Sequence, residues 1–344
     1  MKKKIGFIAV GQAGGNIGKI LEQKGFVVLY LNTSQEDLNT LKDVKFTYHI
    51  KGGEGSNRDR TKAKQLIIQD FEAIEQQIIE KIGVEFLFVI FSAGGGTGSG
   101  AGPMLMELLL GSREQTVGAI TILPAATESV RANMNAYECF TELTEIEGSA
   151  AIFVLDNSKG KILEINQRFV NDFLSFLQIP EKDKSIRGNI DRAEILETLH
   201  AHGMAYITST SRKDTAAIIG TWKNNIYAPM EQDKVIKYIS LSAYGVVRTE
   251  ELQKELGIPL DIYQTYNEER SICALSGLSY PKTRLDEIYQ ITMSQAETVS
   301  RNLSATLSSK MHQDVNFLKQ AEKGMIAKPV EKKVSKHDIM KKYL

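Results

Sequence analysis

The amino-acid sequence predicts an α/β protein with a parallel sheet, on three observations. Short apolar segments rich in Val, Ile and Phe alternate with helix-like segments. Most of these segments are almost continuously apolar, which is typical of parallel strands covered on both faces. Glycine-rich turns follow two of them. The 344 residues are enough for two domains, or for one large domain with extensions.

The first predicted domain covers residues 1–160 and contains the parallel sheet. Five strands are expected, each followed by a turn and a helix-like segment: 4–10, 26–32, 86–92, 116–124 and 149–157. Ligands of such sheets bind at the carboxyl ends of the strands. Because Gly, Asn and Asp residues collect at those ends, we expect the functional site there.

A central linking helix is predicted within residues 161–187. Apolar residues from Ile162 to Phe176 recur at spacings of three to four and form one stripe. A smaller α/β second domain is predicted over residues 188–282. It is expected to contain helices near 191–202 and 249–257 and strands near 204–210, 235–244 and 271–278.

The C-terminal part predicts a long helix and a basic tail. Glycine and proline are absent from residues 283–322, so we expect one or two long helices within an extension over residues 283–327. Residues 328–344 contain six lysines against Glu331 and Asp338. A solvated, disordered end and a partner-binding tail are both compatible with this composition.

The composition excludes some classes of protein. The formal net charge is zero, which argues against binding a polyanion by electrostatics alone. The only two cysteines, Cys139 and Cys273, are far apart, so we expect a reducing compartment and no disulfide framework. No uninterrupted apolar stretch is long enough to span a membrane, and the first apolar run is too short for a signal peptide. We therefore expect a cytoplasmic protein.

A glycine-rich stretch, FVIFSAGGGTGSGAGP over residues 88–103, follows a predicted strand. Such a run lets the backbone approach a ligand closely and points free N–H groups at an anion, which the helix dipole also favours. Residues 93–100 therefore predict a phosphate cradle, with the hydroxyl groups of Thr97 and Ser99 as further donors. Tight packing of a helix on a strand is the alternative, but we expect it to need only one or two glycines.

The two commonest nucleotide-binding motifs do not fit. A P-loop needs Gly-Lys-Ser/Thr, but the stretch has no lysine, and Gly18-Lys19 is followed by Ile20. The first turn, GQAGGNIG over residues 11–18, departs from G-x-G-x-x-G because residue 13 is alanine. Two glycine-rich turns therefore predict a phosphate ligand held in another way.

The sequence GGGTGSG, residues 94–100, resembles the signature loop of the tubulin and FtsZ family. Further segments resemble other loops of that family, in order and with similar spacing, from residue 4 to about residue 300. They are GQAGGNIG (11–18), GEGSN (53–57), Pro124 with Glu128, and LDN (155–157). The resemblance implies a parallel-sheet GTP-binding domain that takes GTP or GDP, with Mg²⁺ held mainly by phosphates and water.

The resemblance also implies which residues contact the nucleotide. It transfers phosphate contacts to Gly11, Gln12, Ala13, Gly53, Gly55, Asn57, Gly94, Gly95, Gly96, Thr97, Gly98 and Ser99. It transfers ribose and guanine contacts to Asn16, Glu128, Asn157, Asn171 and Gln167. An amide both donates to and accepts from a purine edge. Arg58 and Arg60 stand where FtsZ has neutral or acidic residues, and we expect either phosphate contacts or a solvated face.

The segment GNIDRAEIL, residues 188–196, resembles the seventh loop of the family and the helix after it. The resemblance implies that Asn189, Asp191 and Glu194 enter the nucleotide pocket of the next subunit, where the two carboxylates orient water. Polymerisation into a head-to-tail filament would then activate GTP hydrolysis. The alternative is that Asp191 and Glu194 are ordinary helix-start carboxylates.

The C-terminal organisation resembles the TubZ group of plasmid and phage tubulins. This implies a role in DNA partition, in which a TubR-like DNA-binding adaptor binds the tail and contact with DNA is indirect. The tail residues concerned are Lys332, Lys333, Lys336, Lys341 and Lys342. An FtsZ-type division GTPase is one alternative. A Rossmann-type dinucleotide oxidoreductase is another, but Glu36 and Asp37 follow the second strand only after a turn.

Overall fold

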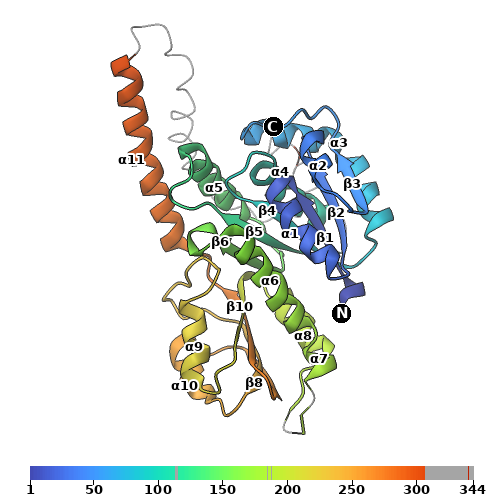
Figure 1. Ribbon diagram of the computed structural model, residues 1–344, viewed down its shortest axis with the longest axis vertical. Helices are drawn as coiled ribbons and strands as arrows, with labels where there is room; N and C mark the ends of the chain where they lie inside the picture. Colours follow the sequence, from blue (N-terminus) through green and yellow to red (C-terminus); the bar gives the residue numbers. More distant parts are fainter. Residues whose placement is uncertain (113–114, 184, 187, 307–339, 341–344) are drawn as a thin grey trace.

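The computed structural model describes residues 1–112, 115–183, 185–186, 188–306 and 340 (Figure 1). Ten strands in this part of the chain form one sheet, in the order β3-β2-β1-β4-β5-β6-β7-β10-β8-β9. Helices pack on the sheet, and Figure 1 shows α6 running between an upper and a lower lobe. The predicted α/β class is therefore confirmed.

The first six strands are parallel and form the upper lobe. They are β1 (Ile5–Val10), β2 (Val27–Asn32), β3 (Phe46–His49), β4 (Phe86–Ser92), β5 (Thr116–Leu123) and β6 (Ala151–Asp156). Strands β1, β4 and β6 are buried over their whole length or nearly so. Continuous burial on both faces explains why their sequences are apolar rather than alternating.

The sheet continues into the lower lobe through a parallel pairing of β6 with β7. The strands there are β7 (Gly203–Thr210), β8 (Tyr238–Tyr244), β9 (Asp261–Asn267) and β10 (Ser271–Leu278). Strand β10 lies antiparallel between β7 and β8. The predicted domain boundaries stay predictions, because one continuous sheet passes through both lobes.

The sequence did not indicate β3 and β9, which form the two edges of the sheet. Both are only partly buried, so their sequences, FTYH and DIYQTYN, lack an apolar run. Central strands need apolar residues on both faces, whereas an edge strand can be polar and still pair through its backbone. The remaining strands lie within a few residues of their predicted positions.

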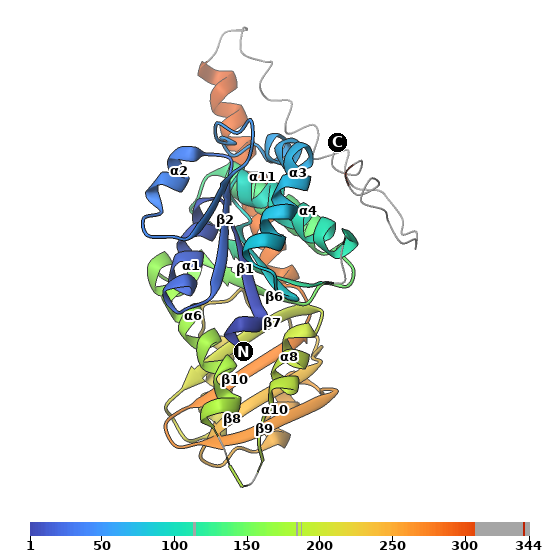
Figure 2. The same cartoon turned by 90° about the vertical axis from the view of Figure 1, so that its right-hand side faces the viewer.

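Helices cover both faces of the upper lobe, with α1 and α6 on one side and α3 and α4 on the other (Figure 2). The helices of this lobe are α1 (Gly11–Gln23), α2 (Gln35–Thr40), α3 (Arg60–Lys81), α4 (Thr97–Ser112), α5 (Val130–Leu143) and α6 (Ile162–Leu177). Those that follow are α7 (Ile179–Lys182), α8 (Arg192–His200), α9 (Thr215–Lys223), α10 (Thr249–Leu256) and α11 (Lys282–Thr306).

Helix α6 is fixed by the apolar stripe that the sequence predicts. Its residues Phe169, Phe173 and Phe176 are fully buried. The ring of Phe173 packs edge-on against Phe88 of β4 and Phe153 of β6, with centroid distances of 5.7 and 5.8 Å. These contacts hold the helix rigidly across the sheet. Its 16 residues span about 24 Å at a rise of 1.5 Å per residue.

Helix α11 begins at Lys282 and runs along α5, where the rings of Tyr137 and Tyr289 lie 4.8 Å apart (Figure 1). The predicted C-terminal helix is present as far as Thr306. Its expected continuation to residue 327, and the five tail lysines at positions 332, 333, 336, 341 and 342, lie outside the described residues. No helix in the described part of the chain has the length and apolar character needed to cross a membrane.

We predict that Gly118→Ala destabilises the sheet. A Cβ atom at Gly118 of β5 would lie 2.6 Å from the carbonyl oxygen of Ala151 and 2.6 Å from the ring of Phe88. Overpacking of this kind costs about 1–3 kcal/mol of unfolding free energy. Urea unfolding would measure this as a lower midpoint.

The matched control is Gly220→Ala in α9, where no atom lies within 4 Å of the new Cβ atom. This change should raise the unfolding free energy by roughly 0.5–1 kcal/mol, because alanine favours a helix interior over glycine. Equal midpoints for the two variants would contradict the packing described here.

Candidate functional site

A cavity of about 850 Å³ lies where β4, β5 and β6 end and α1 and α6 begin. This volume is in the range of a small-molecule or cofactor site. The residues that line it are Gln12, Ala13, Asn16, Ser92, Ile122, Ala125, Glu128, Asn157, Gly160, Lys161, Ile162, Leu163, Glu164 and Asn166. The site therefore lies at the carboxyl ends of parallel strands, as the sequence predicts.

The start of α1 forms one wall of the cavity. Helix α1 begins at Gly11, which has a φ of +71°, and no side chain caps its first N–H groups. The first N–H groups of a helix need an acceptor from elsewhere. Gln12 and Ala13 of this turn line the cavity. An anion in the cavity would satisfy these donors and interact favourably with the helix dipole.

Packing accounts for more of the glycine-rich stretch than we expected from the sequence. A Cβ atom at Gly96 would lie 2.6 Å from Cα of Arg58, and one at Gly100 would lie 2.5 Å from the carbonyl oxygen of Arg60. At Gly102 it would lie 2.5 Å from the ring of Phe91. The expectation that packing needs only one or two of these glycines was therefore wrong.

Gly95 is the exception in this stretch, since its Cβ atom would have no neighbour closer than 3.9 Å. Gly95 is also partly exposed, whereas the glycines on either side of it are buried. A Cβ atom at Gly11 would lie 3.5 Å from the backbone nitrogen of Gly98. The two predicted phosphate turns are therefore adjacent, at the starts of α1 and α4.

The two hydroxyl groups that the sequence suggests as phosphate donors are bonded within the protein. Ser99 is fully buried, and its Oγ donates to the carbonyl oxygen of Gly95. Oγ1 of Thr97 lies 2.7 Å from Oγ1 of Thr33 and 3.1 Å from Oγ of Ser56. These bonds tie together the ends of β2, the 53–57 segment and α4. Backbone N–H groups are left as the donors of the cradle.

The 53–57 segment packs beside the glycine turn rather than lining the cavity. The backbone N–H of Gly55 donates to the carbonyl oxygen of Thr33 at 2.8 Å, and a Cβ atom at Gly53 would lie 2.5 Å from the same oxygen. Asn57 is exposed, with a φ of +46°. Nδ2 of Asn135, on α5, donates to the carbonyl oxygens of Arg58 and Gly95 and so joins this segment to the glycine turn.

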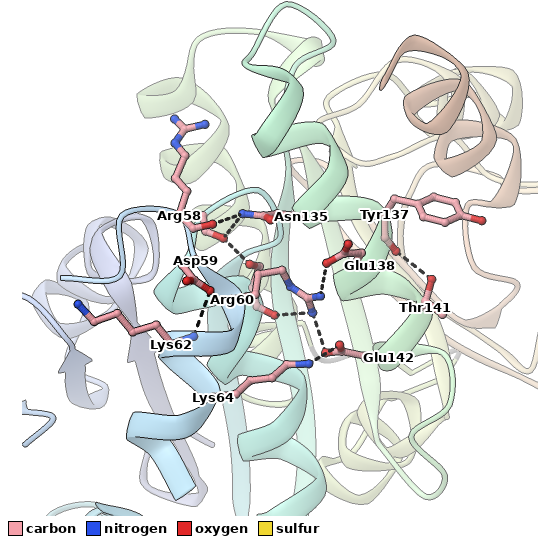
Figure 3. A network of polar contacts seen from close by, with 12 residues as sticks. Arg58, Asp59, Arg60, Lys62, Lys64, Asn135, Tyr137, Glu138, Thr141 and Glu142 are labelled. Atoms are coloured by element: carbon pink, nitrogen blue, oxygen red, sulfur yellow. Dashed lines mark hydrogen bonds and ion pairs between the residues drawn. The ribbon is translucent and has the colours of Figure 1, made fainter. Parts of the chain in front are cut away.

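Arg60 takes neither of the roles expected for it. Its side chain is 7% exposed and forms ion pairs with Glu138 at 2.8 Å and Glu142 at 2.7 Å, both on α5 (Figure 3). It also donates to the carbonyl oxygen of Ser99 at 3.2 Å. Burial would lower the pKa of Arg60, but the charges of the two glutamates outweigh it and raise the pKa. Arg60 therefore joins α3, α4 and α5 behind the glycine turn.

Arg58 points away from this network and is exposed (Figure 3). Its Nη1 donates to Oγ of Ser129 at 2.6 Å, so it joins the 53–57 segment to the start of α5. Arg60 thus joins its neighbouring helices through buried contacts, whereas Arg58 forms its contact at the surface.

Glu128 and Asn157 form the opposite wall of the cavity. Oε1 of Glu128 accepts from the backbone N–H of Ala125 at 3.1 Å and from Nδ2 of Asn157 at 3.3 Å. Oδ1 of Asn157 is buried and has no hydrogen-bond partner. A buried acceptor without a partner is costly, and a donor from a ligand in the cavity that Asn157 lines would satisfy it. Asn16, on α1, is exposed and also lines the cavity.

Helix α6 brings a different asparagine to the cavity from the one that the sequence suggests. Asn166, which is 4% exposed, lines the cavity, as does Ile162 one turn before it. Gln167 and Asn171 do not line it, and Nε2 of Gln167 donates to Oδ1 of Asn171 on the exposed side of the helix. The sequence contained a signal for this. The predicted helix begins near Ile162, and only the first turns of a helix that follows a strand lie near the strand ends.

The three predicted catalytic residues lie beyond the far end of α6, away from the cavity. Oδ1 of Asp191 accepts from the backbone N–H groups of Ala193 and Glu194, and Oε2 of Glu194 accepts from the N–H of Asp191 at 2.8 Å. This reciprocal pair is a capping box at the start of α8. Oδ1 of Asn189 accepts from the N–H of Ser185 at 2.9 Å. Within one chain the two carboxylates therefore act as helix caps.

Part of the chain matches a known protein family. The description "Tubulin/FtsZ family, GTPase domain" matches residues 4–166. The matched residues contain both glycine turns and all the residues that line the cavity. The family resemblance predicted from the glycine-rich motifs is thus confirmed.

Over its whole length the chain is similar to the tubulin-like protein TubZ of Clostridium botulinum C phage, at 29% identity with 100% of each chain covered. The crystal structure of Clostridium botulinum phage c-st TubZ superimposes with a TM-score of 0.79 at 28% identity, over 87% of this chain and 100% of that one. A GTPγS-form protofilament of Bacillus thuringiensis TubZ has the same fold, with a TM-score of 0.73 at 15% identity over 87% and 94% of the two chains.

Proposed function

We propose that this protein is a GTPase that assembles head to tail into filaments and hydrolyses GTP between neighbouring copies. One observation carries the proposal: the cavity and the acidic capping box lie at opposite ends of α6. A carboxylate that orients a water must lie within hydrogen-bond reach of it. A helix of about 24 Å separates the two, so the capping box cannot reach the cavity of its own chain. The capping box of one copy therefore orients water in the cavity of another.

The nucleotide roles follow from the two walls of the cavity. The phosphates bind the N–H groups at the starts of α1 and α4, around Gly11 and Gly95, which have no side chain in the way. The 53–57 segment completes this side through its packing on Thr97. The guanine donates to Oδ1 of Asn157 from its N–H groups, while Asn16 and Glu128 contact the base or ribose. Asn166 takes the place that the sequence assigns to Asn171.

Magnesium would be held by the nucleotide and water. In the described residues, no group of three or more His, Cys, Asp or Glu side chains could hold a metal ion. Mg²⁺ is commonly bound through substrate phosphates with several waters retained. Bound in this way, the ion would neutralise charge that develops on the phosphates during transfer.

The capping box suits a catalytic role between copies. It holds Asp191 and Glu194 in fixed orientations through one oxygen of each carboxylate, and each has a second oxygen for contact with water. Asn189 lies beside them and would contact the phosphate or the nucleotide. A GTPase that is completed only by a second copy hydrolyses GTP when it polymerises.

We further propose that the filament moves plasmid or phage DNA through a DNA-binding adaptor that binds the lysine-rich tail. The similarity to phage TubZ over the full chain supports this. An FtsZ-type role in division is the alternative. An oxidoreductase is disfavoured, because the first domain matches a GTPase family. Light scattering after addition of GTP and Mg²⁺ tests assembly, and an unchanged signal would contradict it.

We predict that Asn166→Ala weakens GTP binding by about tenfold, the loss expected for one good hydrogen bond to the ligand. Asn171→Ala, on the exposed side of the same helix, should leave the affinity within about twofold. Titration with a fluorescent GTP analogue measures both variants. The opposite ranking would restore the role that the sequence assigns to Asn171.

We predict that Glu194→Gln lowers GTP turnover by about 10²-fold or more, because general-base assistance contributes on this scale. Glutamine still completes the capping box, so folding, GTP binding and filament formation should persist. Phosphate release measures the turnover, and sedimentation measures the filaments. Glu255→Gln, at an exposed position in α10, is the control. Turnover at the wild-type rate in Glu194→Gln would remove this carboxylate from the reaction.

We predict that deletion of residues 328–344 spares GTP turnover and filaments but abolishes binding to the adaptor. The reason is that the deleted segment carries a surplus of four positive charges and lies after all the residues assigned to the nucleotide. Cosedimentation of filaments with a purified TubR-like adaptor on its DNA measures this. The control replaces the five tail lysines with glutamine at full length. Undiminished adaptor binding by the deleted chain would contradict the role of the tail.

A further inference from the structure

A buried arginine of α11 binds groups behind the wall of the cavity that carries Asn157. Arg284, in the first turn of α11, is 4% exposed, and its partner Asp156 at the end of β6 is completely buried. Nε of Arg284 donates to Oδ2 of Asp156 at 2.8 Å, and Nη2 donates to Oδ1 at 3.4 Å. Nη2 also donates to the carbonyl oxygen of Pro124 at 3.3 Å.

Arg284 also pairs with Glu287 on its own helix at 2.9 Å. Its other two partners, Pro124 and Asp156, lie directly before two residues that line the cavity. Pro124 precedes Ala125, and Asp156 precedes Asn157. Oδ1 of Asp156 also accepts from the N–H of Ser158 at 2.8 Å, which caps the short 3₁₀ helix Asn157–Lys159. Arg284 therefore fixes the end of β5 and the turn that carries Asn157.

Hydrogen bonds close this wall into a ring. Glu128 accepts from both Ala125 and Asn157, the two residues that follow the groups bound by Arg284. The orientation of the Asn157 amide is thus set on one side by Glu128 and on the other by the turn that Asp156 caps. Asn157 lines the cavity, and its Oδ1 has no hydrogen-bond partner within the protein.

Arg60 provides the matched comparison on the phosphate side. It too is a buried arginine paired with carboxylates, and it too binds a backbone oxygen of a ligand loop, that of Ser99. Its contacts all lie behind the glycine turn, whereas those of Arg284 lie behind Asn157. Arg60 therefore supports the glycine turn on the proposed phosphate side, and Arg284 separately supports the Asn157 turn on the proposed base side.

We propose that Arg284 is a positioning residue for base selection, which holds the Asn157 turn in the geometry that accepts hydrogen bonds from guanine. The inference rests on the proposed GTP site. Guanine presents N–H donors at N1 and N2, where adenine presents none. An amide oxygen held in one position therefore favours guanine, and one that moves loses this preference while the phosphate contacts persist.

The test compares GTP and ATP dissociation constants by competition against a fluorescent nucleotide. In the full chain, Arg284→Met should weaken GTP binding by about tenfold and leave ATP binding within about twofold, so the preference for GTP falls. Arg284→Lys should lose part of the preference, because one ammonium group cannot bind Asp156 and Pro124 in the same forked way. Arg60→Met should weaken GTP and ATP binding in the same proportion.

A second variant distinguishes a loss of base selection from a loss of folding. Arg284→Met alone leaves the Asp156 carboxylate buried without its partner, which destabilises proteins. The double variant Arg284→Met/Asp156→Asn removes both charges and should fold, as thermal unfolding would verify. It should show the same loss of preference for GTP.

The result that would overturn the inference is a preference for GTP over ATP that stays as in the wild type in the folded Arg284 variants. Arg284 would then be only a structural brace. Failure of the proposed function would be recognised separately, because the wild-type chain itself would then bind neither GTP nor ATP.

Discussion

The packing of α6 on the sheet is the constraint on which the account of this protein depends. Phe169, Phe173 and Phe176 are buried against the strands, so the helix cannot bend back and bring its far end to the cavity. It begins at the wall of the cavity and ends on the side of the acidic capping box. In the proposed function, each end of such a chain supplies half of an active site, and copies joined in series complete it.

The cavity is shaped by buried charges that lie behind its walls. Arg60 is paired with Glu138 and Glu142, and Arg284 with Asp156. A buried pair of this kind contributes little net stability, but removal of one partner is costly. Both arginines also hold backbone oxygens of the ligand loops. Their arrangement therefore serves geometry more than stability, and it ties α3, α5 and α11 to the segments around the cavity.

Local patterns in the sequence predicted the central strands, the stripe of α6 and the glycine turns, and a cavity lies at the strand ends where they led us to expect the site. The edge strands β3 and β9 were missed because a partly exposed strand needs no apolar run. Long-range contacts could not be predicted either: Arg284 binds a residue 128 positions away. Asn166 rather than Asn171 lines the cavity because of where α6 begins. The glycine turns were located correctly, but the reason for each glycine could not be predicted. Close packing and ligand binding both require a residue without a side chain.

The rate of GTP hydrolysis per molecule, measured across protein concentrations, tests the shared active site most directly. The account predicts that dilute protein binds GTP but hydrolyses it slowly, and that the rate per molecule rises steeply above the concentration at which filaments form. A rate per molecule that stays constant down to dilutions where the protein is monomeric would contradict it, because one chain would then contain all that hydrolysis needs.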